Sequence, residues 1–452
     1  MNETPKGTKD LNPKDVLIRD CIFESIKKIF IKYGGKPVDT PIFECQDLVQ
    51  NIYGEEFNKL VYKLDDQGGQ KLILRYDLTM PFARYMGSNG LSSFKRYQIG
   101  KVYRRDQPIM NRGRFREFYQ CDFDIAGSSE VMSYDTEILN VLCECLDKLI
   151  KPKTYTVLVN HRQILYDVLT SFGLSNEFHA CVCSTLDKID KYPENQVIEM
   201  VVEELTLKNI DVDIIKKITD FVTLITNQKM KDPLNINKNE PIDILNLLKD
   251  HKLIQDNVYD EMNILFEYLQ MTNCYHNISF SPLLARGLDY YTGLIYEATY
   301  NDKNIMESSI AAGGRYDNLL KKFSNQESVN AIGMSLGIER LVTIIENDNF
   351  NFDFPNPQVY IVGIGKNMMK YKLKLCAKFR NIGIYPEMSY RKEIMKEAIS
   401  NAIIKKIKFM IIIGEDEVNR NTIKIKDIEL RKEIEYLYDD GINFIDKYYN
   451  YF

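Results

Sequence analysis

Apolar residues near the N-terminus recur at helical spacing and then give way to segments rich in β-branched and aromatic residues. Residues 12–33 are predicted to form a helix that ends at Gly34 and Gly35, since glycine commonly terminates helices. After this helix we predict strands at 38–44, 71–79, 93–106 and 114–127, and a helix at 80–86. The last two strands would form a long antiparallel hairpin with its tip at 107–113. Pro41 interrupts the first strand, which places that strand at a sheet edge or a subunit contact.

The middle of the chain changes to a helical pattern. Helices are predicted at 134–150 and 161–172, and the following residues to 270 are rich in lysine and glutamate, with few glycines. We interpret 165–275 as a helical insertion. Strand character returns at 278–300, and a strand running into a helix is predicted at 332–346.

The C-terminal part alternates strands and helices after a segment rich in turn residues, NDNFNFDFPNP at 347–357, which is the predicted linker. Strands are predicted at 359–365, 384–389, 409–414, 422–428 and 432–438, with helices between them that end at Arg380 and near Ile404. This order predicts a small α/β domain with a mixed sheet at 358–452. A larger domain of α+β class is expected at 1–350, with the helical insertion inside it.

Composition narrows the class of protein. Apolar residues make up 44% of the chain, but the longest apolar runs resemble FMIII at 409–413, far short of the ~18 residues that a membrane span needs. The first residues show no targeting pattern, and the nine cysteines lack disulfide or zinc spacing, so we expect a cytoplasmic protein with reduced thiols. The four histidines form no cluster, so neither a protein metal site nor a nucleophilic enzyme is expected.

Basic residues concentrate in the predicted hairpin although the net charge is −5. Between Phe94 and Gln120 stand two acidic residues and eight basic ones: Lys95, Arg96, Lys101, Arg104, Arg105, Arg112, Arg114 and Arg116. Arginine provides a planar fork that suits phosphate and base stacking, so we interpret this run as a phosphate or nucleotide contact. The alternatives are a solvated face or a basic strand packed against acidic neighbours.

Polar groups inside strand-like segments indicate a pocket. Asp122 and Asp124 alternate with apolar residues and share one sheet face with Gln120. Three polar groups on one face of a strand resemble a pocket floor, although structural carboxylates with satisfied hydrogen bonds are the alternative. The stretch ARGLDYYTGLIYEATY at 285–300 adds Arg286, which suits a carboxylate or phosphate, and the hydroxyls of Tyr290 and Tyr291.

These segments resemble the histidyl-tRNA synthetase family, and in particular its eukaryotic cytosolic type, over nearly the whole chain. PKGTKD (5–10) is similar to the family's N-terminal signature, and DTPIFE (39–44) is similar to class II motif 1. YRRD (103–106) through GRFREFYQCDFDIAG (113–127) matches motif 2, and GMSLGIERL (333–341) matches motif 3. ARGLDYYTG (285–293) and AAGGRYD (311–317) match two histidine-specific motifs. The tail resembles the family's anticodon-binding domain.

The resemblance implies a fold and a site. It implies a class II antiparallel catalytic sheet of six or seven strands, with L-histidine bound by Asp77 and Thr79 at its α-ammonium and by Gln120 at its carboxyl end. Asp124 and Tyr291 would meet the two imidazole nitrogens, with Tyr290 and Tyr316 lining the pocket. Arg104 and Arg286 would contact the histidine carboxylate and the α-phosphate and act as the catalytic residues.

The ATP site implied by the resemblance uses the hairpin and the motif 3 helix. Phe118 and Arg340 would sandwich adenine, and Arg340 and Arg114 would reach the β- and γ-phosphates, with Mg²⁺ bridging the ATP oxygens. Asp106, where motif 2 generally has glutamate, is assigned to the same site. The loop 107–113 would approach the acceptor end of tRNA(His).

The implied activity is ATP-dependent attachment of histidine to tRNA(His) through histidyl-adenylate, by a homodimer. Two alternatives remain at this point. One is a catalytically inactive synthetase-like protein with a regulatory or tRNA-sensing role. The other is a class II ligase for a different amino acid.

Overall fold

The computed structural model describes residues 3–50, 59–65, 68–110, 113–188, 192–230, 241–272, 274–285, 290–323, 329–347 and 357–450. The chain divides into two compact units, Met1–Phe350 and Asn351–Phe452. Nearly all of the predicted linker at 347–357 lies outside the described residues. Within the described part, no helix has the length and apolar character that crossing a membrane requires.

The first unit is built on a sheet in the order β1-β4-β5-β10-β9-β8-β6-β7. Its strands are β1 (Lys36–Pro37), β4 (Phe94–Tyr103), β5 (Glu117–Gly127), β6 (Tyr155–His161), β7 (Ile278–Phe280), β8 (Leu294–Tyr300), β9 (Ala311–Arg315) and β10 (Asn330–Gly337). The inner pairs from β4 to β6 are all antiparallel, whereas the edge pairs β1–β4 and β6–β7 are parallel. The large sheet therefore has eight strands among the described residues, rather than six or seven, because two short parallel strands extend its edges.

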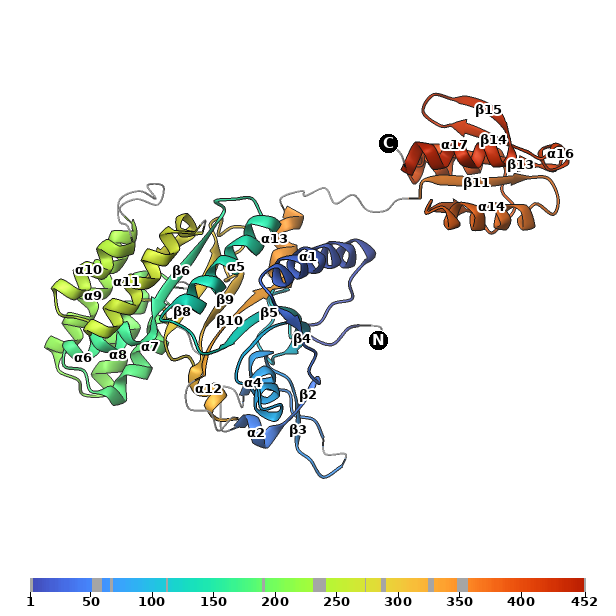
Figure 1. The fold of residues 1–452 in the computed structure, drawn as a ribbon. Helices are drawn as coiled ribbons and strands as arrows, with labels where there is room; N and C mark the ends of the chain where they lie inside the picture. The colour runs from blue at the N-terminus through green and yellow to red at the C-terminus, as the bar shows by residue number, and fades with distance from the viewer. Residues whose placement is uncertain are drawn as a thin grey trace. The chain divides into compact units, whose positions relative to one another are not determined.

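Three helices cover one face of this sheet: α1 (Pro13–Lys32), α5 (Ser133–Leu149) and α13 (Ile338–Asn347) (Figure 1). The predicted first helix is confirmed, with Asn12 capping its first turn by accepting a hydrogen bond from the main-chain nitrogen of Asp15 at 3.0 Å. Phe30 of α1 packs on Phe123 of β5, with ring centroids 5.1 Å apart. The odd-numbered residues of β5 thus face α1, and the even-numbered ones point to the opposite face.

Two predicted strands are shorter than expected and do not join the large sheet. The segment 38–44 contributes only β2 (Phe43–Cys45), and 71–79 contributes only β3 (Leu72–Leu74), which pairs with β2 in a separate sheet. The Arg75 guanidinium donates to the carbonyls of Thr40 and Lys101, at 2.8 and 2.7 Å. Together with a main-chain bond from the Tyr103 nitrogen to the Arg75 carbonyl at 3.1 Å, these bonds tie the ends of β2 and β3 to β4 without a continuous ladder.

The strand predicted at 278–300 is interrupted. It contributes β7 and β8, and the described residues between them are not strand. Pro282 has no main-chain N–H for a ladder, and the Asn160 amide donates to the carbonyls of Pro282 and Leu284 at 3.1 and 2.9 Å. Strand β8 therefore begins only at Leu294, and Tyr290 and Tyr291 lie just before it, outside the sheet.

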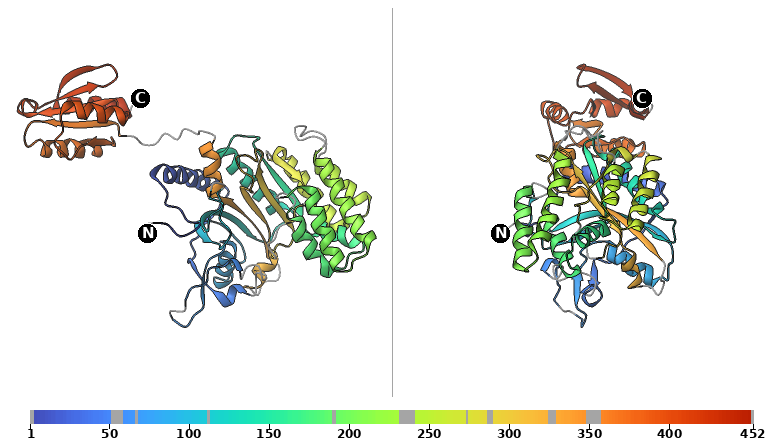
Figure 2. Two further views of the ribbon diagram at one scale, coloured as in Figure 1. Left: turned by 180° about the vertical axis from the view of Figure 1, so that it is seen from behind. Right: turned by 90° about the vertical axis from the view of Figure 1, so that its left-hand side faces the viewer.

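Between β6 and β7 the described residues form six α-helices that gather at one edge of the sheet (Figures 1 and 2). They are α6 (Arg162–Ser171), α7 (His179–Leu186), α8 (Glu194–Leu207), α9 (Val212–Met230), α10 (Pro241–Asp250) and α11 (Asp256–Gln270). Val197, Leu205 and Leu265 are among the residues of this helical group with no exposed surface. Two shorter helices, α4 (Thr79–Ser88) and α12 (Asp317–Lys321), lie on the face of the large sheet that α1 does not cover.

The second unit contains a sheet in the order β12-β11-β13-β14-β15. Its strands are β11 (Val359–Ile364), β12 (Pro386–Met388), β13 (Phe409–Gly414), β14 (Thr422–Asp427) and β15 (Lys432–Leu437), and its helices are α14 (Met369–Asn381), α15 (Met395–Ile404), α16 (Glu415–Arg420) and α17 (Tyr438–Asn450). β12, β11 and β13 are parallel, and β14 and β15 are antiparallel to their neighbours, which confirms the predicted mixed sheet. Helices α16 and α17 were not predicted.

Candidate active site

The candidate site lies on the sheet face that α1 does not cover. Gln120, Asp122 and Asp124 of β5 point there, and the register of the β4–β5 hairpin places Arg96 directly opposite Asp124. Arg96, Asp122 and Asp124 are all at least 98% buried. Three charged residues are thus withdrawn from water inside the sheet face.

Arg96 links the two buried carboxylates. Its Nη2 lies 2.7 Å from Asp124 Oδ2 and 3.8 Å from Asp122 Oδ2, and donates to the carbonyl of Leu78 at 2.9 Å. The guanidinium also lies 4.8 Å from the centre of the Phe82 ring, within cation–π range. Arg96 therefore fixes the position of Asp124 while compensating its charge.

Both carboxylates have raised pKa values. Burial raises the pKa of Asp122 to about 7, against the opposing effect of Arg96, with the negative charge of Asp124 adding to the rise. Burial also raises the pKa of Asp124, and Arg96 and the hydrogen bond from Tyr316 oppose that rise. Perturbed carboxyl groups of this kind are typical of functional sites.

Two glycines make room for the side chains at this face. A Cβ atom on Gly333 of β10 would lie 1.9 Å from Asp124 Oδ1, and one on Gly314 of β9 would lie 2.8 Å from the Tyr291 ring. Gly314 and Gly333 are paired across β9 and β10, and Gly333 is paired with Asp124. Main chain therefore forms the surface between Asp124 and Tyr291.

Three tyrosines gather over this surface. Tyr316 donates to Asp124 Oδ1 at 2.5 Å. The Tyr290 ring centroid lies 5.1 Å from that of Tyr291 and 6.2 Å from that of Tyr316. Burial is the main cause that raises the pKa of Tyr290 and of Tyr316 well above the usual value, so both phenols keep their protons and remain hydrogen-bond donors.

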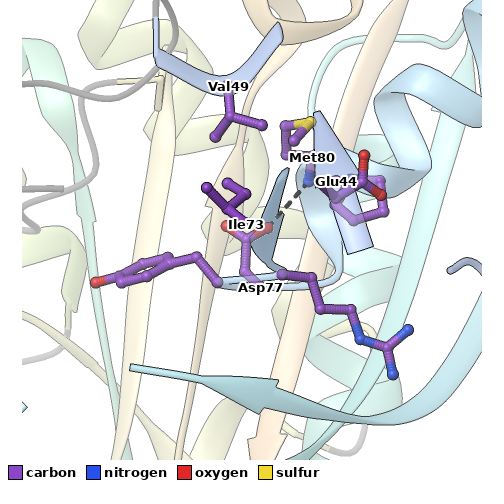
Figure 3. A pocket seen from close by; sticks show the side chains of 8 residues that line it. Glu44, Val49, Ile73, Asp77 and Met80 are labelled. Atoms are coloured by element: carbon purple, nitrogen blue, oxygen red, sulfur yellow. Dashed lines mark hydrogen bonds between the residues drawn. The ribbon is translucent and has the colours of Figure 1, made fainter. Parts of the chain in front are cut away.

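Asp77 stands at the start of α4, on the other side of Tyr290. Its Oδ1 accepts from the main-chain nitrogen of Met80 at 3.1 Å, and its Oδ2 accepts from the Tyr290 hydroxyl at 3.4 Å. Figure 3 shows the Asp77 carboxylate between Ile73 and Met80. Thr79 lies close enough to the Tyr290 hydroxyl to counter part of the rise in its pKa, so Asp77, Thr79 and Tyr290 form one cluster.

Gln120 retains one unused polar atom. Its Nε2 donates to the Ser335 hydroxyl at 2.8 Å, and its buried Oε1 has no hydrogen-bond partner among the described residues. A buried acceptor without a partner is destabilising unless a ligand supplies the donor.

The predicted nucleotide residues occupy the open end of the hairpin. The Arg104 guanidinium lies between two rings, 4.2 Å from the centre of Tyr76 and 5.3 Å from that of Phe118, and its Nε donates to the carbonyl of Tyr76. Arg114 pairs with Asp106 at 3.2 Å and its side chain is 41% exposed. Arg104 and Phe118 are thus preassembled, and Arg114 remains accessible to solvent.

The start of α13 meets the hairpin loop. Gly113, with φ +67, passes so close to Arg340 that a Cβ atom there would lie 3.0 Å from the Arg340 Cα atom. Arg340 Nη1 donates to the main-chain carbonyl of Ser309 and, at 3.3 Å, to its hydroxyl. Beside it, burial raises the pKa of Glu339 to about 7, and this carboxyl accepts from the main-chain nitrogen of Tyr119.

The structure brings together most of the predicted site residues and leaves one undescribed. Asp77, Thr79, Tyr290, Tyr291, Tyr316 and Asp124 form the connected group above, whereas Arg286 lies outside the described residues. The basic run divides: Lys95 and Lys101 pair with Glu137 and Glu117, and Arg96 with Asp124, as the alternative of packing against acidic neighbours expects. Arg104 and Arg114 remain compatible with a phosphate contact.

Sequence reasoning missed the role of Arg96 and the Glu339 contact with β5. The signal for Arg96 was present, because a hairpin whose tip is centred on residue 110 pairs residues whose numbers sum to 220. Arg96 and Asp124 satisfy that rule and are paired in the structure. No comparable local signal connects Glu339 with Tyr119, which are 220 residues apart.

Comparisons with known proteins identify the family of the chain. A family model described as "Histidyl-tRNA synthetase" matches residues 7–341, and one described as "Anticodon binding domain" matches residues 358–448. "Histidine--tRNA ligase, cytoplasmic" of Dictyostelium discoideum is 39% identical over 96% of this chain and 88% of that protein. "Histidine--tRNA ligase, mitochondrial" of Bos taurus is 36% identical over 96% of this chain and 85% of that protein.

Solved structures show the same fold. The crystal structure of histidyl-tRNA synthetase from Nostoc sp. PCC 7120 superposes with a TM-score of 0.75 and covers 99% of both chains, at 24% identity. The first family model covers more than half of the chain, and both relatives are similar over nearly all of it. The chain therefore belongs to the histidyl-tRNA synthetase family.

Proposed function

We propose that this chain joins L-histidine to ATP, forming histidyl-adenylate and pyrophosphate, and then transfers the histidyl group to the 3′ end of tRNA(His). The observation that carries the proposal is the buried Asp124 carboxylate, held by Arg96 at 2.7 Å and by Tyr316 at 2.5 Å above a glycine surface. A preorganised carboxylate beside phenol groups suits a small ring that carries a polar N–H.

Asp124 and Tyr291 would recognise the imidazole. A neutral imidazole has one N–H donor and one acceptor nitrogen, so a carboxylate and a phenol on opposite sides satisfy both. Tyr316 holds Asp124 in place from the side. Asp124 Oδ1 already accepts from Tyr316, whereas the buried Oδ2 accepts no hydrogen bond among the described residues. An amino acid without these nitrogens would leave Oδ2 without a donor, which discriminates by about 10⁴-fold in sites of this kind.

Asp77, Thr79 and Gln120 would hold the α-ammonium group. Asp77 supplies charge, and Thr79 lies in the same cluster through Tyr290. The contacts of Gln120 favour a different role from the one the resemblance implied, because its donor is bound to Ser335 and its open atom is the acceptor Oε1. We therefore assign Gln120 to the ammonium rather than to the carboxyl end.

Arg104, together with Arg286, would draw the histidine carboxylate onto the α-phosphate. A carboxylate oxygen attacks the α-phosphorus and pyrophosphate leaves, so catalysis needs positioning and positive charge rather than a general base. Phe118 and Arg340 would sandwich adenine, with Asp106 beside it. Arg114 would exchange Asp106 for the β- and γ-phosphates, which Arg340 would also reach.

Mg²⁺ would enter this reaction as part of the ATP substrate, bound to phosphate oxygens. The described residues contain no group of three His, Cys, Asp or Glu residues placed to hold a metal ion of their own. The site residues therefore act on the metal–nucleotide complex mainly through arginine.

The partners proposed are tRNA(His) and a second copy of the chain, in the cytoplasm. The second unit, which matches the anticodon-binding model, would contact the anticodon. Next to Pro41, the side chains of Ile42, Phe43 and Leu48 are 43%, 56% and 45% exposed, an apolar group that a homodimer contact would cover.

Exchange of pyrophosphate into ATP, measured with each amino acid in turn, tests the proposal. Histidine should support the fastest exchange, and the protein should also aminoacylate tRNA(His). If another amino acid supports faster exchange, the chain is a ligase for that amino acid. ATP binding without any exchange or charging would instead favour a synthetase-like regulatory protein, although Asp77, Arg104 and Asp124 are all in place.

Asp124→Asn tests the assignment of the imidazole contact. The variant should raise the histidine KM by about 100-fold, because the amide is uncharged and presents an N–H toward the ring. The ATP KM should stay within about twofold of its original value. Asp20→Asn, at an exposed position of α1, is the matched control. Equal damage to both KM values would place Asp124 outside the histidine site.

A further inference from the structure

Arg162 contacts the main chain of the loop 290–293, which carries Tyr291. It is the first residue of α6, where the chain leaves β6 for the helical insertion. Its main-chain nitrogen donates to the carbonyl of Gly293 at 2.9 Å, and its Nη1 donates to the carbonyl of Tyr291 at 2.6 Å. One residue therefore binds the main chain on both sides of Thr292.

The opposite side of this loop is held by β9. The main-chain nitrogen of Thr292 donates to the carbonyl of Arg315 at 2.8 Å, and the Tyr291 ring rests on Gly314. The position of the Tyr291 ring is thus set between Gly314 on one side and the hydrogen bonds of Arg162 on the other. Charge-assisted bonds from a guanidinium are stronger than neutral ones, so the bond to the Tyr291 carbonyl contributes more than its neighbours.

Packing contributes less on the Arg162 side. A cavity of about 470 Å³ separates α6 from α12 there, lined by Arg162, Gln163, Tyr166, Tyr290, Tyr291, Thr292, Asn318, Leu319 and Lys322. Because side chains do not fill this space, hydrogen bonds have a larger share in holding the loop than they have in a close-packed core.

His161, the residue before Arg162, contacts the last helix of the helical insertion. His161 caps α6 by accepting at Nδ1 from the main-chain nitrogen of Gln163, so its Nε2 carries the hydrogen. This Nε2 lies 3.2 Å from Glu261 of α11, and the hydrogen bond lowers the pKa of Glu261. The first and last helices of the insertion therefore meet at residues 161–162.

We infer that Arg162 is a positioning residue for histidine recognition, which sets Tyr291 through its carbonyl and couples the helical insertion to the amino-acid site. Arg162 acts through the loop and does not itself touch the substrate. The inference rests on the proposed function only for its catalytic consequence. Its structural part, the restraint of residues 290–293, stands independently.

Three variants separate positioning from mere helix stability. Arg162→Ala removes the guanidinium bonds to the Tyr291 carbonyl and the Tyr166 hydroxyl. Arg162→Lys keeps the charge and a single donor. Tyr166→Phe removes only the hydroxyl that accepts from Arg162 Nη2 at 3.2 Å and leaves the bond to Tyr291 intact, so it is the matched control.

Pyrophosphate exchange gives the first readout. Arg162→Ala should raise the histidine KM by about tenfold or more and leave the ATP KM within about twofold, since misplacement of one contact group weakens only its own ligand. Arg162→Lys should raise the histidine KM by about threefold, and Tyr166→Phe should change neither. Equal increases in both KM values, or a Tyr166→Phe effect as large as that of Arg162→Ala, would overturn the inference. If Arg162→Ala fails to fold, the lysine variant decides, by whether the histidine KM rises more than the ATP KM.

Hydrogen exchange gives a readout that needs no activity. The Arg162 variants should lose amide protection in the peptide that covers residues 290–296, and should retain it in α13. Unchanged protection of that peptide would show that Arg162 does not restrain residues 290–293, even if the enzyme is active. An unaltered protein that shows no histidine-dependent exchange would refute the proposed function, while the hydrogen-exchange result would still decide the role of Arg162.

Discussion

The two faces of β5 differ in chemistry: one packs in the apolar core, and the other carries the carboxylates of the candidate site. Cys121, Phe123 and Ile125 face α1 and have no exposed surface, whereas Asp122 and Asp124 face the site and are only 2% and 1% exposed. Burial alone therefore does not distinguish the faces. What differs is that apolar side chains need only a matching shape, while each buried carboxylate needs a specific partner.

That need explains the residues around Asp124. Arg96 supplies compensating charge, Tyr316 supplies a donor, and Gly333 leaves room for Oδ1. Charge, hydrogen-bond donation and space for Oδ1 are thus each supplied by a different residue. The apolar face is accordingly expected to tolerate substitution, and the site face is not.

The largest effect is expected from Arg96→Met, which leaves two buried carboxylates without their cation. Breaking a buried ion pair on one side typically costs about 3–5 kcal/mol, so the free energy of unfolding should fall by that order. Histidine-dependent exchange should be lost, because Asp124 would protonate or move. Urea denaturation and exchange assays measure both, and a variant with unchanged stability would show that Arg96 does not compensate these carboxylates.

Gly333→Ala should come next, with its effect confined to recognition. The new methyl would stand 1.9 Å from Asp124 Oδ1, so the carboxylate must move. Displacement of a contact group by about 1 Å costs on the order of 100-fold, and we expect this loss in kcat/KM for histidine. Gly68→Ala, where the added Cβ meets no atom within 4 Å, is the control. A histidine kcat/KM close to that of the control would remove Gly333 from the site.

Asp122→Asn should change how stability depends on pH. The pKa of Asp122 is about 7 in the folded protein and ordinarily 3.8, so the folded state binds this proton more tightly than the unfolded state. Stability from this group is therefore lost as pH rises from about 4 through about 7. The Asn variant does not titrate, so its melting temperature should fall less between about pH 5.5 and about pH 8.

Glu339→Gln provides the comparison for this measurement, since Glu339 has a pKa of about 7 and burial as its main cause. It should flatten the same pH profile without altering the histidine KM, because its contact is the main chain of Tyr119. If Asp122→Asn leaves the pH profile unchanged, Asp122 is ionised in the folded protein throughout this range.

The smallest effect on recognition is expected from Phe123→Leu, on the α1 face. It should lower the free energy of unfolding by about 1–2 kcal/mol through lost packing with Phe30. The histidine and ATP KM values should stay within about twofold of the original protein, as measured by exchange. A selective rise in the histidine KM would show that the two faces are not independent.

Local patterns predicted the parts of the fold whose partners are near in sequence. The α1 helix and the β4–β5 hairpin follow from spacing and turn residues, although the pairing of Arg96 with Asp124 across the hairpin was not predicted. The resemblance supplied the candidate site residues. The C-terminal mixed sheet followed from the alternation of apolar runs.

Long-range contacts account for what the sequence did not predict. The Arg75 guanidinium joins the segment of β2 and β3 to β4 through the carbonyls of Thr40 and Lys101, a contact that no local pattern reveals. Helix α17 contains Gly441, whose propensity disfavours a helix, and it is stabilised by packing such as that of Tyr448 on Phe409, with centroids 4.8 Å apart. The Tyr316–Asp124 bond spans 192 residues.

Gly314 and Gly333 have a consequence for how this protein can evolve. A Cβ atom at Gly333 would press on Asp124 and one at Gly314 would press on the Tyr291 ring, and glycine is already the smallest residue. Any single substitution at either position can only add atoms at this surface. In the proposed site, space for a bulkier amino acid would therefore have to come from other residues than these two glycines, whereas one added methyl group would be enough to displace Asp124 or Tyr291.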